Sequence, residues 1–102
     1  MMDTPLDHEV FSKNLETTFR ISIDDTNSID AELSNVTELQ LSPGQERFSV
    51  VFRGPKEPLL GQGTYSFRHE QMGQFVLFIV PMRQDDDGTS YEAVFNRLRK
   101  GD

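Results

Sequence analysis

Alternating apolar and polar residues run through most of the chain, and a period of two is typical of strands with one buried face. Residues 17–23, 29–33 and 48–52 follow this pattern, and their inward positions are predicted to be Phe19, Ile21, Ile23, Ile29, Ala31, Leu33, Phe48, Val50 and Phe52. The phase changes after Leu33, which predicts a bulge or a bend near Asn35. The first half of the chain should therefore contain several strands with their apolar faces toward one core.

Residues 60–96 predict three further strands joined by two hairpins. The middle strand, residues 75–81, is apolar at every position, so both of its faces need cover and it should be the central strand. We take residues 70–73 and residues 85–88 as four-residue loops, and opposed residues then share a face. Both hairpins predict the same aromatic face, which supports this register; its members would form the main core and are Tyr65, Phe67, Val76, Phe78, Val80, Ala93 and Phe95.

The same register leaves a second apolar surface on the opposite side of these strands. It carries Phe75, Leu77, Ile79 and Val94. A short helix covers only a strip of a curled sheet, so part of this surface should stay open. Apolar side chains beside an open strand edge favour pairing with another chain. We therefore expect these residues to form the interface with a protein partner or a second copy.

A short amphipathic helix is predicted at the start of the chain. Thr4 can cap it, Pro5 suits its first position, and Asp7 suits its positive end. An apolar stripe follows at near-helical spacing and predicts roughly two to three turns; it comprises Leu6, Val10, Phe11 and Leu15. The helix should lie across one face of the sheet or plug one end of it.

Together these elements predict a mainly β fold, a small antiparallel barrel or curled sheet of about six strands with one short N-terminal helix. The 102 residues fit a single domain. Within it, residues 1–15 would form the helical segment, residues 16–97 the β domain and residues 98–102 a polar tail.

Charge narrows the range of partners. The formal net charge is -7, from 10 Lys+Arg against 17 Asp+Glu, and this surplus repels nucleic-acid phosphates and anionic membrane surfaces. We expect a protein partner or self-association, and neither nucleic acid nor membrane. The chain has no cysteine, which excludes disulfides and Cys-ligated zinc. Its start lacks the pattern of a signal peptide, and residues 75–81 are too few to span a bilayer.

Aspartate-rich turns are the candidates for metal ligands. Residues 85–87 are all aspartate and precede Gly88, and carboxylates at alternate positions beside a glycine suit calcium. The glycine comes too early for an EF-hand and no glutamate closes the shell, so we expect solvated turns here and at residues 24–25. If the closed sheet brings the two turns to the same end, they could share one cation, and this alternative is left open.

No residue pattern indicates catalysis. The histidines, His8 and His69, lack partners at the spacing that catalysis or zinc binding requires. We expect no catalytic, cofactor-binding or metal-binding residue, and no enzyme activity. The expected function is a non-enzymatic structural or protein-interaction module. The alternative is a small-ligand-binding barrel, although a barrel of this size is normally filled by its own side chains; a small enzyme ranks below both.

Several stretches resemble a small bacterial family of uncharacterised domains. They are residues 48–55 (FSVVFRGP), 60–65 (LGQGTY), 77–81 (LFIVP) and 91–96 (YEAVFN), and the likeness extends from Phe11 over nearly all of the chain. Members often lie near proteins with phage tail collar domains, so the resemblance implies an accessory of a tail-like or fibre-like assembly. It supplies no catalytic residues. The expected location is the cytoplasm or a released tail-like assembly.

Overall fold

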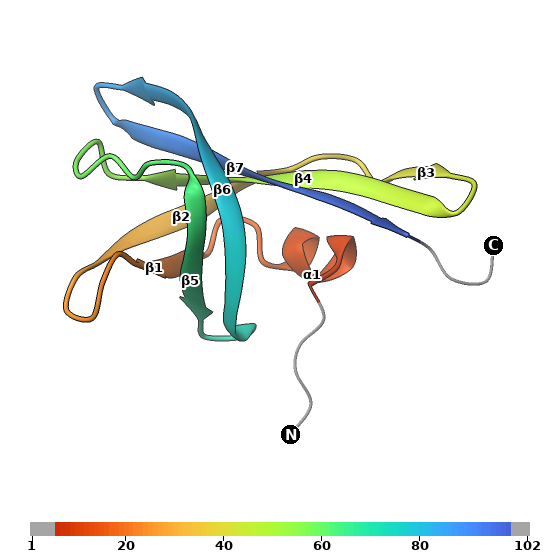
Figure 1. The fold of residues 1–102 in the computed structure, drawn as a ribbon, viewed down its shortest axis with the longest axis horizontal. Helices are drawn as coiled ribbons and strands as arrows, with labels where there is room; N and C mark the ends of the chain where they lie inside the picture. Colours follow the sequence, from red (N-terminus) through yellow and green to blue (C-terminus); the bar gives the residue numbers. More distant parts are fainter. Residues whose placement is uncertain (1–5, 99–102) are drawn as a thin grey trace.

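The structure, a computed structural model, describes residues 6–98, in which antiparallel strands close into a barrel (Figure 1). The elements of this range are α1 (His8–Lys13), β1 (Thr18–Ser22), β2 (Ser28–Val36), β3 (Gln40–Ser42), β4 (Gln45–Gly54), β5 (Gly63–His69), β6 (Gly73–Asp85) and β7 (Gly88–Leu98). Their order is β2-β1-β5-β6-β7-β4-β3, and β2 also pairs with β4, so six strands close into a ring and β3 lies outside it. For the described residues, the predicted mainly β fold of about six strands with a short helix is confirmed.

The strands whose sequences alternate turn their predicted faces inward. The predicted inward residues that are buried in the core are Phe19, Ile21, Ile29, Ala31, Leu33, Phe48, Val50 and Phe52. Ile23 is the exception, because β1 ends at Ser22 and the side chain of Ile23 is exposed. The register between β2 and β4 shifts between Leu33 and Asn35, which confirms the predicted irregularity.

The β5–β6 hairpin is tighter than predicted. His69 pairs with Gly73, so the loop comprises residues 70–72, and the prediction of a four-residue loop is wrong. Gly73 has a φ of 79°, a left-handed conformation that suits a glycine after a three-residue loop. The His69 ring draws the loop together, because its Nδ1 accepts hydrogen bonds from the N–H groups of Gln71 at 3.0 Å and Met72 at 3.1 Å.

The β6–β7 hairpin also departs from the predicted four-residue loop. Asp85 pairs with Gly88, which leaves a two-residue turn. The register then shifts at Met82, where one extra residue bulges out of the ladder. As a result Val80 pairs with Glu92, one residue away from its predicted partner. Both hairpins thus displace β6 by one residue in the same sense.

This displacement turns β6 over, because a slip of one residue exchanges the two faces of a strand. Leu77 and Ile79 are buried in the core, and Phe75 packs against it. The predicted aromatic face is therefore wrong for β6, whose exposed side chains include Val76, Phe78 and Val80. The neighbouring strands keep their predicted faces, and the side chains that lie in or against the core are Tyr65, Phe67, Ala93 and Phe95.

α1 is shorter than predicted and packs into the barrel opening. Asp7 caps it, since the Asp7 carboxylate accepts a hydrogen bond from the Val10 N–H at 2.9 Å. The predicted cap Thr4 and first residue Pro5 lie outside the described residues. No helix within residues 6–98 is long and apolar enough to cross a membrane. Phe11 is fully buried, and its ring contacts the rings of Phe48, Phe75 and Phe95.

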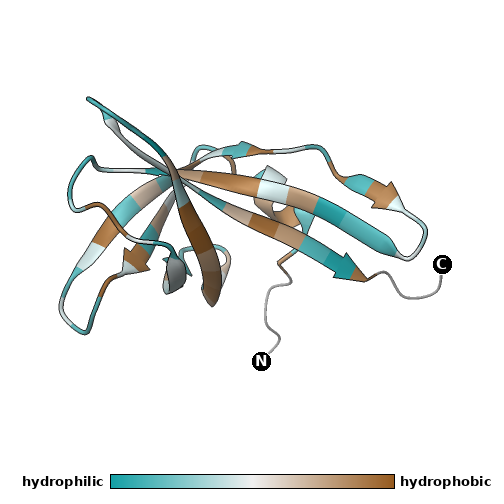
Figure 2. Ribbon diagram, turned by 45° about the horizontal axis from the view of Figure 1, so that its top comes forward, coloured by the Kyte–Doolittle hydropathy of each residue, from teal (hydrophilic) through white to brown (hydrophobic). Residues whose placement is uncertain are grey.

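Arg97 ties the far end of β7 to the segment before α1. Its Nη1 donates a hydrogen bond to the Leu6 carbonyl at 2.6 Å, and its Nη2 pairs with the Glu46 carboxylate at 3.1 Å. The guanidinium lies over the rings of Phe48 and Phe95, at 5.6 and 5.5 Å from their centroids. Figure 2 shows that the start of β4 and the end of β7, which pair with each other, are mostly polar. The contacts of Arg97 therefore replace part of the apolar packing there.

His69 is a buried polar residue with a defined protonation state. The Thr17 hydroxyl donates to the Asn14 carbonyl at 2.6 Å, so it accepts from the His69 Nε2 at 2.8 Å. Because Nδ1 accepts two backbone N–H groups, the ring is neutral and carries its proton on Nε2. Burial lowers the pKa of His69, since desolvation disfavours the charged ring, and the charge of nearby Glu70 opposes this shift.

The free energy of unfolding is expected to fall as the pH drops below about 6.5, the pKa of an unperturbed histidine. The unfolded chain then binds a proton at His69 that the folded protein, with its lowered pKa, does not yet bind. This stabilisation is present above the unfolded pKa and is lost as the pH falls through the folded pKa. Urea midpoints at about pH 7.5 and about pH 5.5 should differ more for the parent than for His69→Gln. Equal differences in the two proteins would contradict this role of His69.

Candidate functional site

The outer face of β6 and β7 exposes apolar side chains beside one another, and we call this set the β6–β7 outer face. Its members and their exposed fractions are Val76 (62%), Phe78 (54%), Val80 (37%) and Val94 (51%). Because Leu77 and Ile79 point into the core, the residues next to them on β6 point outward. Figure 2 shows the continuous apolar stretch along β6 that supplies both faces. A contiguous exposed apolar patch of this kind is typical of interaction sites.

The structure divides the predicted interface residues between two faces. Val94 lies on the β6–β7 outer face, whereas the residues that pack in or against the core are Phe75, Leu77 and Ile79. The reversal of β6 is the cause, and it brings to the surface the side chains that were predicted to be buried, Val76, Phe78 and Val80. Gly73 was the signal that could have found them, because a glycine in the left-handed conformation commonly ends a three-residue hairpin loop.

β6 and β7 separate after a short shared ladder (Figure 1). Their pairing runs from the Asp85–Gly88 pair to the Val80–Glu92 pair. Beyond that point, within the part of the chain that the structure describes, β6 pairs only with β5 and β7 only with β4. A depression of about 330 Å³ opens at this gap, and its lining includes Val76, Phe78, Val80, Glu92, Val94 and Phe95.

α1 fills the inner side of the gap between β6 and β7. The Phe11 ring lies 6.3 Å from the Phe75 ring and 5.4 Å from the Phe95 ring, measured between centroids. Among residues 6–98, no backbone hydrogen bond joins α1 or a loop to residues 73–79 of β6 or residues 93–98 of β7. Aromatic side chains therefore line the inner side of the gap. The edges of β6 and β7 that face the gap have no backbone hydrogen-bond partners within the described residues.

Glu92 is the charged residue of this depression. It lies opposite Val51 of β4 and Val80 of β6, so apolar residues flank Glu92, which is partly buried. No ion pair within residues 6–98 includes Glu92. A cationic group of a partner would meet this carboxylate where apolar neighbours exclude part of the water, and attraction between charges is stronger there than in bulk water.

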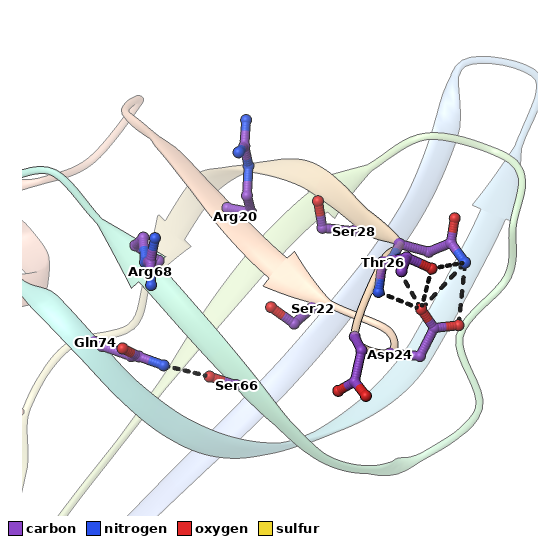
Figure 3. Close-up of a pocket in the computed structure, with 10 residues that line it drawn as sticks. Arg20, Ser22, Asp24, Thr26, Ser28, Ser66, Arg68 and Gln74 are labelled. Atoms are coloured by element: carbon purple, nitrogen blue, oxygen red, sulfur yellow. Dashed lines mark hydrogen bonds between the residues drawn. The ribbon is translucent and has the colours of Figure 1, made fainter.

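A second, polar groove of about 180 Å³ lies on the outer face of β1 and β5 beside the β1–β2 turn (Figure 3). Arg20 and Arg68 occupy directly opposed positions in it, and Arg20 forms an exposed ion pair with Asp30 at 3.4 Å. The carboxylates of Asp24 and Asp25 line the same groove. Opposite charges therefore balance in its lining, and the groove favours no ligand charge.

The aspartate-rich turns use their carboxylates internally. The side chain of Asn27 donates to the Asp24 carboxylate, and this bond is the main cause of the lowered pKa of Asp24. The Arg53 guanidinium pairs with the Asp85 carboxylate and lowers the pKa of Asp85. In the described part of the chain, no group of three or more His, Cys, Asp or Glu could hold a metal ion. That the turns bind no metal tightly stays a prediction.

Aromatic side chains occupy the interior of the barrel. The Phe52 ring contacts the Phe19 and Phe67 rings, at centroid distances of 5.2 and 4.9 Å. Between residues 6 and 98, every buried side-chain nitrogen or oxygen has a hydrogen-bond partner, including those of the buried residues His69 and Thr89. An apolar ligand would have to displace these rings, so we place the candidate site on the outside of the barrel.

Comparison with known proteins identifies the family of the chain. No curated protein and no solved structure matches it. Residues 6–95 match the family described as "Domain of unknown function (DUF6916)", and this confirms the resemblance to a family of uncharacterised domains. The match includes α1 and β1 to β6, together with β7 as far as Phe95. The chain therefore belongs to the DUF6916 family of domains of unknown function.

Proposed function

We propose that this protein is a non-enzymatic structural or protein-interaction module that binds a protein partner through the β6–β7 outer face. The observation that carries the proposal is the grouping of exposed Val76, Phe78, Val80 and Val94 around one depression. Burial of apolar surface contributes roughly 25 cal/mol per Å². Side chains that lie together can be covered by one partner at once, which scattered apolar residues cannot.

The partner that we propose belongs to a tail-like or fibre-like assembly, which the protein would meet in the cytoplasm or in a released particle. This part of the proposal rests on the resemblance to the bacterial domain family whose members lie near tail collar domains. A closed barrel suits an accessory of such an assembly, because closure removes most open strand edges. Association then occurs mainly through the docking face.

Other functions draw less support. A small-ligand-binding barrel needs interior space, which aromatic rings occupy. The pair of Thr17 and His69 has the composition of a nucleophile and a base, with 2.8 Å between Oγ1 and Nε2. The proton on Nε2 points at the hydroxyl, however, and the hydroxyl proton is donated to the Asn14 carbonyl. His69 is thus not arranged to accept a proton from Thr17, which argues for a structural role of the pair.

The full chain, used as bait in an extract of its native cell, tests the proposal. We expect at least one protein to be retained by the parent and by Leu59→Ser but lost with Phe78→Ser. Leu59 is the matched control, since it is 55% exposed and lies between β4 and β5, away from the depression. A tail or fibre component among the lost proteins would support the proposed assembly.

Light scattering over a concentration series completes the test, because a second copy could cover the same face. Self-association that Phe78→Ser abolishes and Leu59→Ser preserves would identify the partner as another copy of the chain. If neither retained proteins nor self-association distinguish Phe78→Ser from Leu59→Ser, the β6–β7 outer face is not an interaction site and the proposal fails.

A further inference from the structure

We propose that the gap between β6 and β7 binds an extended segment of another protein, which adds as a strand to the open edge of β6. The segment would carry apolar side chains at alternate positions and a Lys or Arg that reaches Glu92. This inference rests on the proposed interaction function, and it names both the chemistry of the partner and the way in which the β6–β7 outer face holds it.

The open edge of β6 is the first observation. Residues 73–79 pair with β5 on one side, whereas the ladder with β7 begins only at Val80. The residues of an antiparallel strand direct their backbone N–H and C=O groups alternately to its two sides, so about half of this stretch directs them into the gap. No backbone hydrogen bond within residues 6–98 reaches them there. Such an edge is a template for an added strand.

The gap also fits the dimensions and the side chains of a strand. The open stretch of residues 73–79 spans about 23 Å at 3.3 Å per residue, enough for a strand of ordinary length. Side chains on the outer side of the added strand would pack against Val76, Phe78 and Val94. Those on its inner side would face the partly buried rings of Phe75 and Phe95. Apolar residues at alternate positions follow from these contacts.

Charge selects a foreign segment over a second copy. Each copy carries a formal net charge of -7, and two such surfaces repel each other. Glu92 lines the depression, and no ion pair within the described range neutralises it. A Lys or Arg of the segment would pair with this carboxylate beside Val51 and Val80, where the attraction is less screened than in water.

A displayed library of random peptides, each of roughly ten residues so that it exceeds one strand, is the probe. Peptides are selected on the full chain, and binders that also recognise Phe78→Ser are removed. We expect the enriched peptides to alternate apolar and polar residues and to contain Lys or Arg. A parallel selection on Glu92→Gln should lose the preference for Lys and Arg. Leu59→Ser should select the same peptides as the parent.

Backbone methylation then tests strand addition itself. The best peptide is synthesised with N-methyl groups at one set of alternate amides or at the other. The set whose N–H groups face β6 should lose binding about tenfold or more, since methylation removes ladder hydrogen bonds, and the other set should lose less. In the complex, amide hydrogen exchange of residues 73–79 should slow at the positions that are not bonded to β5.

The outcomes separate the two proposals. A library that yields no Phe78-dependent peptide overturns strand addition by a short segment, whereas the docking face itself is tested by the retained proteins and by light scattering. Phe78-dependent peptides that tolerate methylation at either set, and leave exchange in residues 73–79 unchanged, overturn strand addition alone. A parent that dimerises through this face, with Phe78→Ser monomeric, shows that a second copy occupies the gap. Thermal melts are the control for folding, and Phe78→Ser is expected to be folded because Phe78 is 54% exposed.

Discussion

Phe67→Ala is expected to lower the free energy of unfolding by roughly 3–5 kcal/mol, the cost of truncating a buried phenylalanine. Phe67 is fully buried in β5, and its ring lies 4.9 Å from the Phe52 ring and 5.6 Å from the Phe75 ring. Neighbours on two other strands cannot collapse into the space without moving the ladder. A loss of this size is comparable with much of the stability of a small domain.

Phe78→Ala is the matched control, because it makes the same chemical change on the outside of the barrel. Phe78 is 54% exposed, so we expect a loss of no more than about 1 kcal/mol. Urea unfolding of both variants and the parent measures the difference. The register read from the sequence places both rings on one face and predicts two large losses. Similar losses in the two variants would therefore contradict the observed register of β6.

Gly88→Ala is expected to destabilise the protein by about 1–3 kcal/mol or more, through overpacking. A Cβ atom at residue 88 would overlap the backbone carbonyl oxygen of Gly54 on β4, and a backbone atom cannot move aside as the end of a side chain can. Gly54 pairs with Thr89, so the clash lies within the ladder that joins β4 to β7. The turn that starts β7, which the Asp85 carboxylate holds, would have to shift.

Gly61→Ala is the control for the general effect of replacing glycine. A Cβ atom there would meet no heavy atom within 4 Å, so the variant should match the parent or gain about 0.4–1 kcal/mol from the smaller entropy of the unfolded chain. Thermal melts of the two variants and the parent test the pair. A Gly88→Ala protein that melts with the parent would show that β4 and β7 are not packed as closely as described.

The register error in β6 shows why two agreeing hairpins did not establish the core. The β5–β6 loop was assigned one residue too many, and the bulge at Met82 between β6 and β7 was not predicted. Both errors move β6 in the same sense. The agreement between the two hairpins showed only that β5 and β7 turn the predicted residues to the same face. It did not determine which face of β6 is buried. Residues 75–81 are apolar on both faces, so no alternation could reveal the slip.

Of the predicted interface residues, Val94 is exposed, whereas Leu77 and Ile79 are buried because β6 is turned over. Val94 was placed correctly, because β7 alternates and its buried neighbour Ala93 fixes its direction. The gap that exposes the edge of β6 has no local signature, since it depends on where β6 and β7 stop pairing. The role that we propose for Glu92 depends on its position between Val51 and Val80, which lie on strands distant in the sequence.

The sequence by itself determined the class of the fold, the inward faces of β1, β2, β4, β5 and β7, the irregularity after Leu33 and the negative net charge. These properties depend on alternation and charge, which neighbouring residues already express. Tertiary structure decided which face of β6 is buried, where Met82 bulges and where β6 leaves β7. It also decided the closure of β2 on β4 and the position of Phe11 under the gap. Those choices depend on pairing between distant segments, where the ring of His69 and the packing of the core select one register among several with similar local energies.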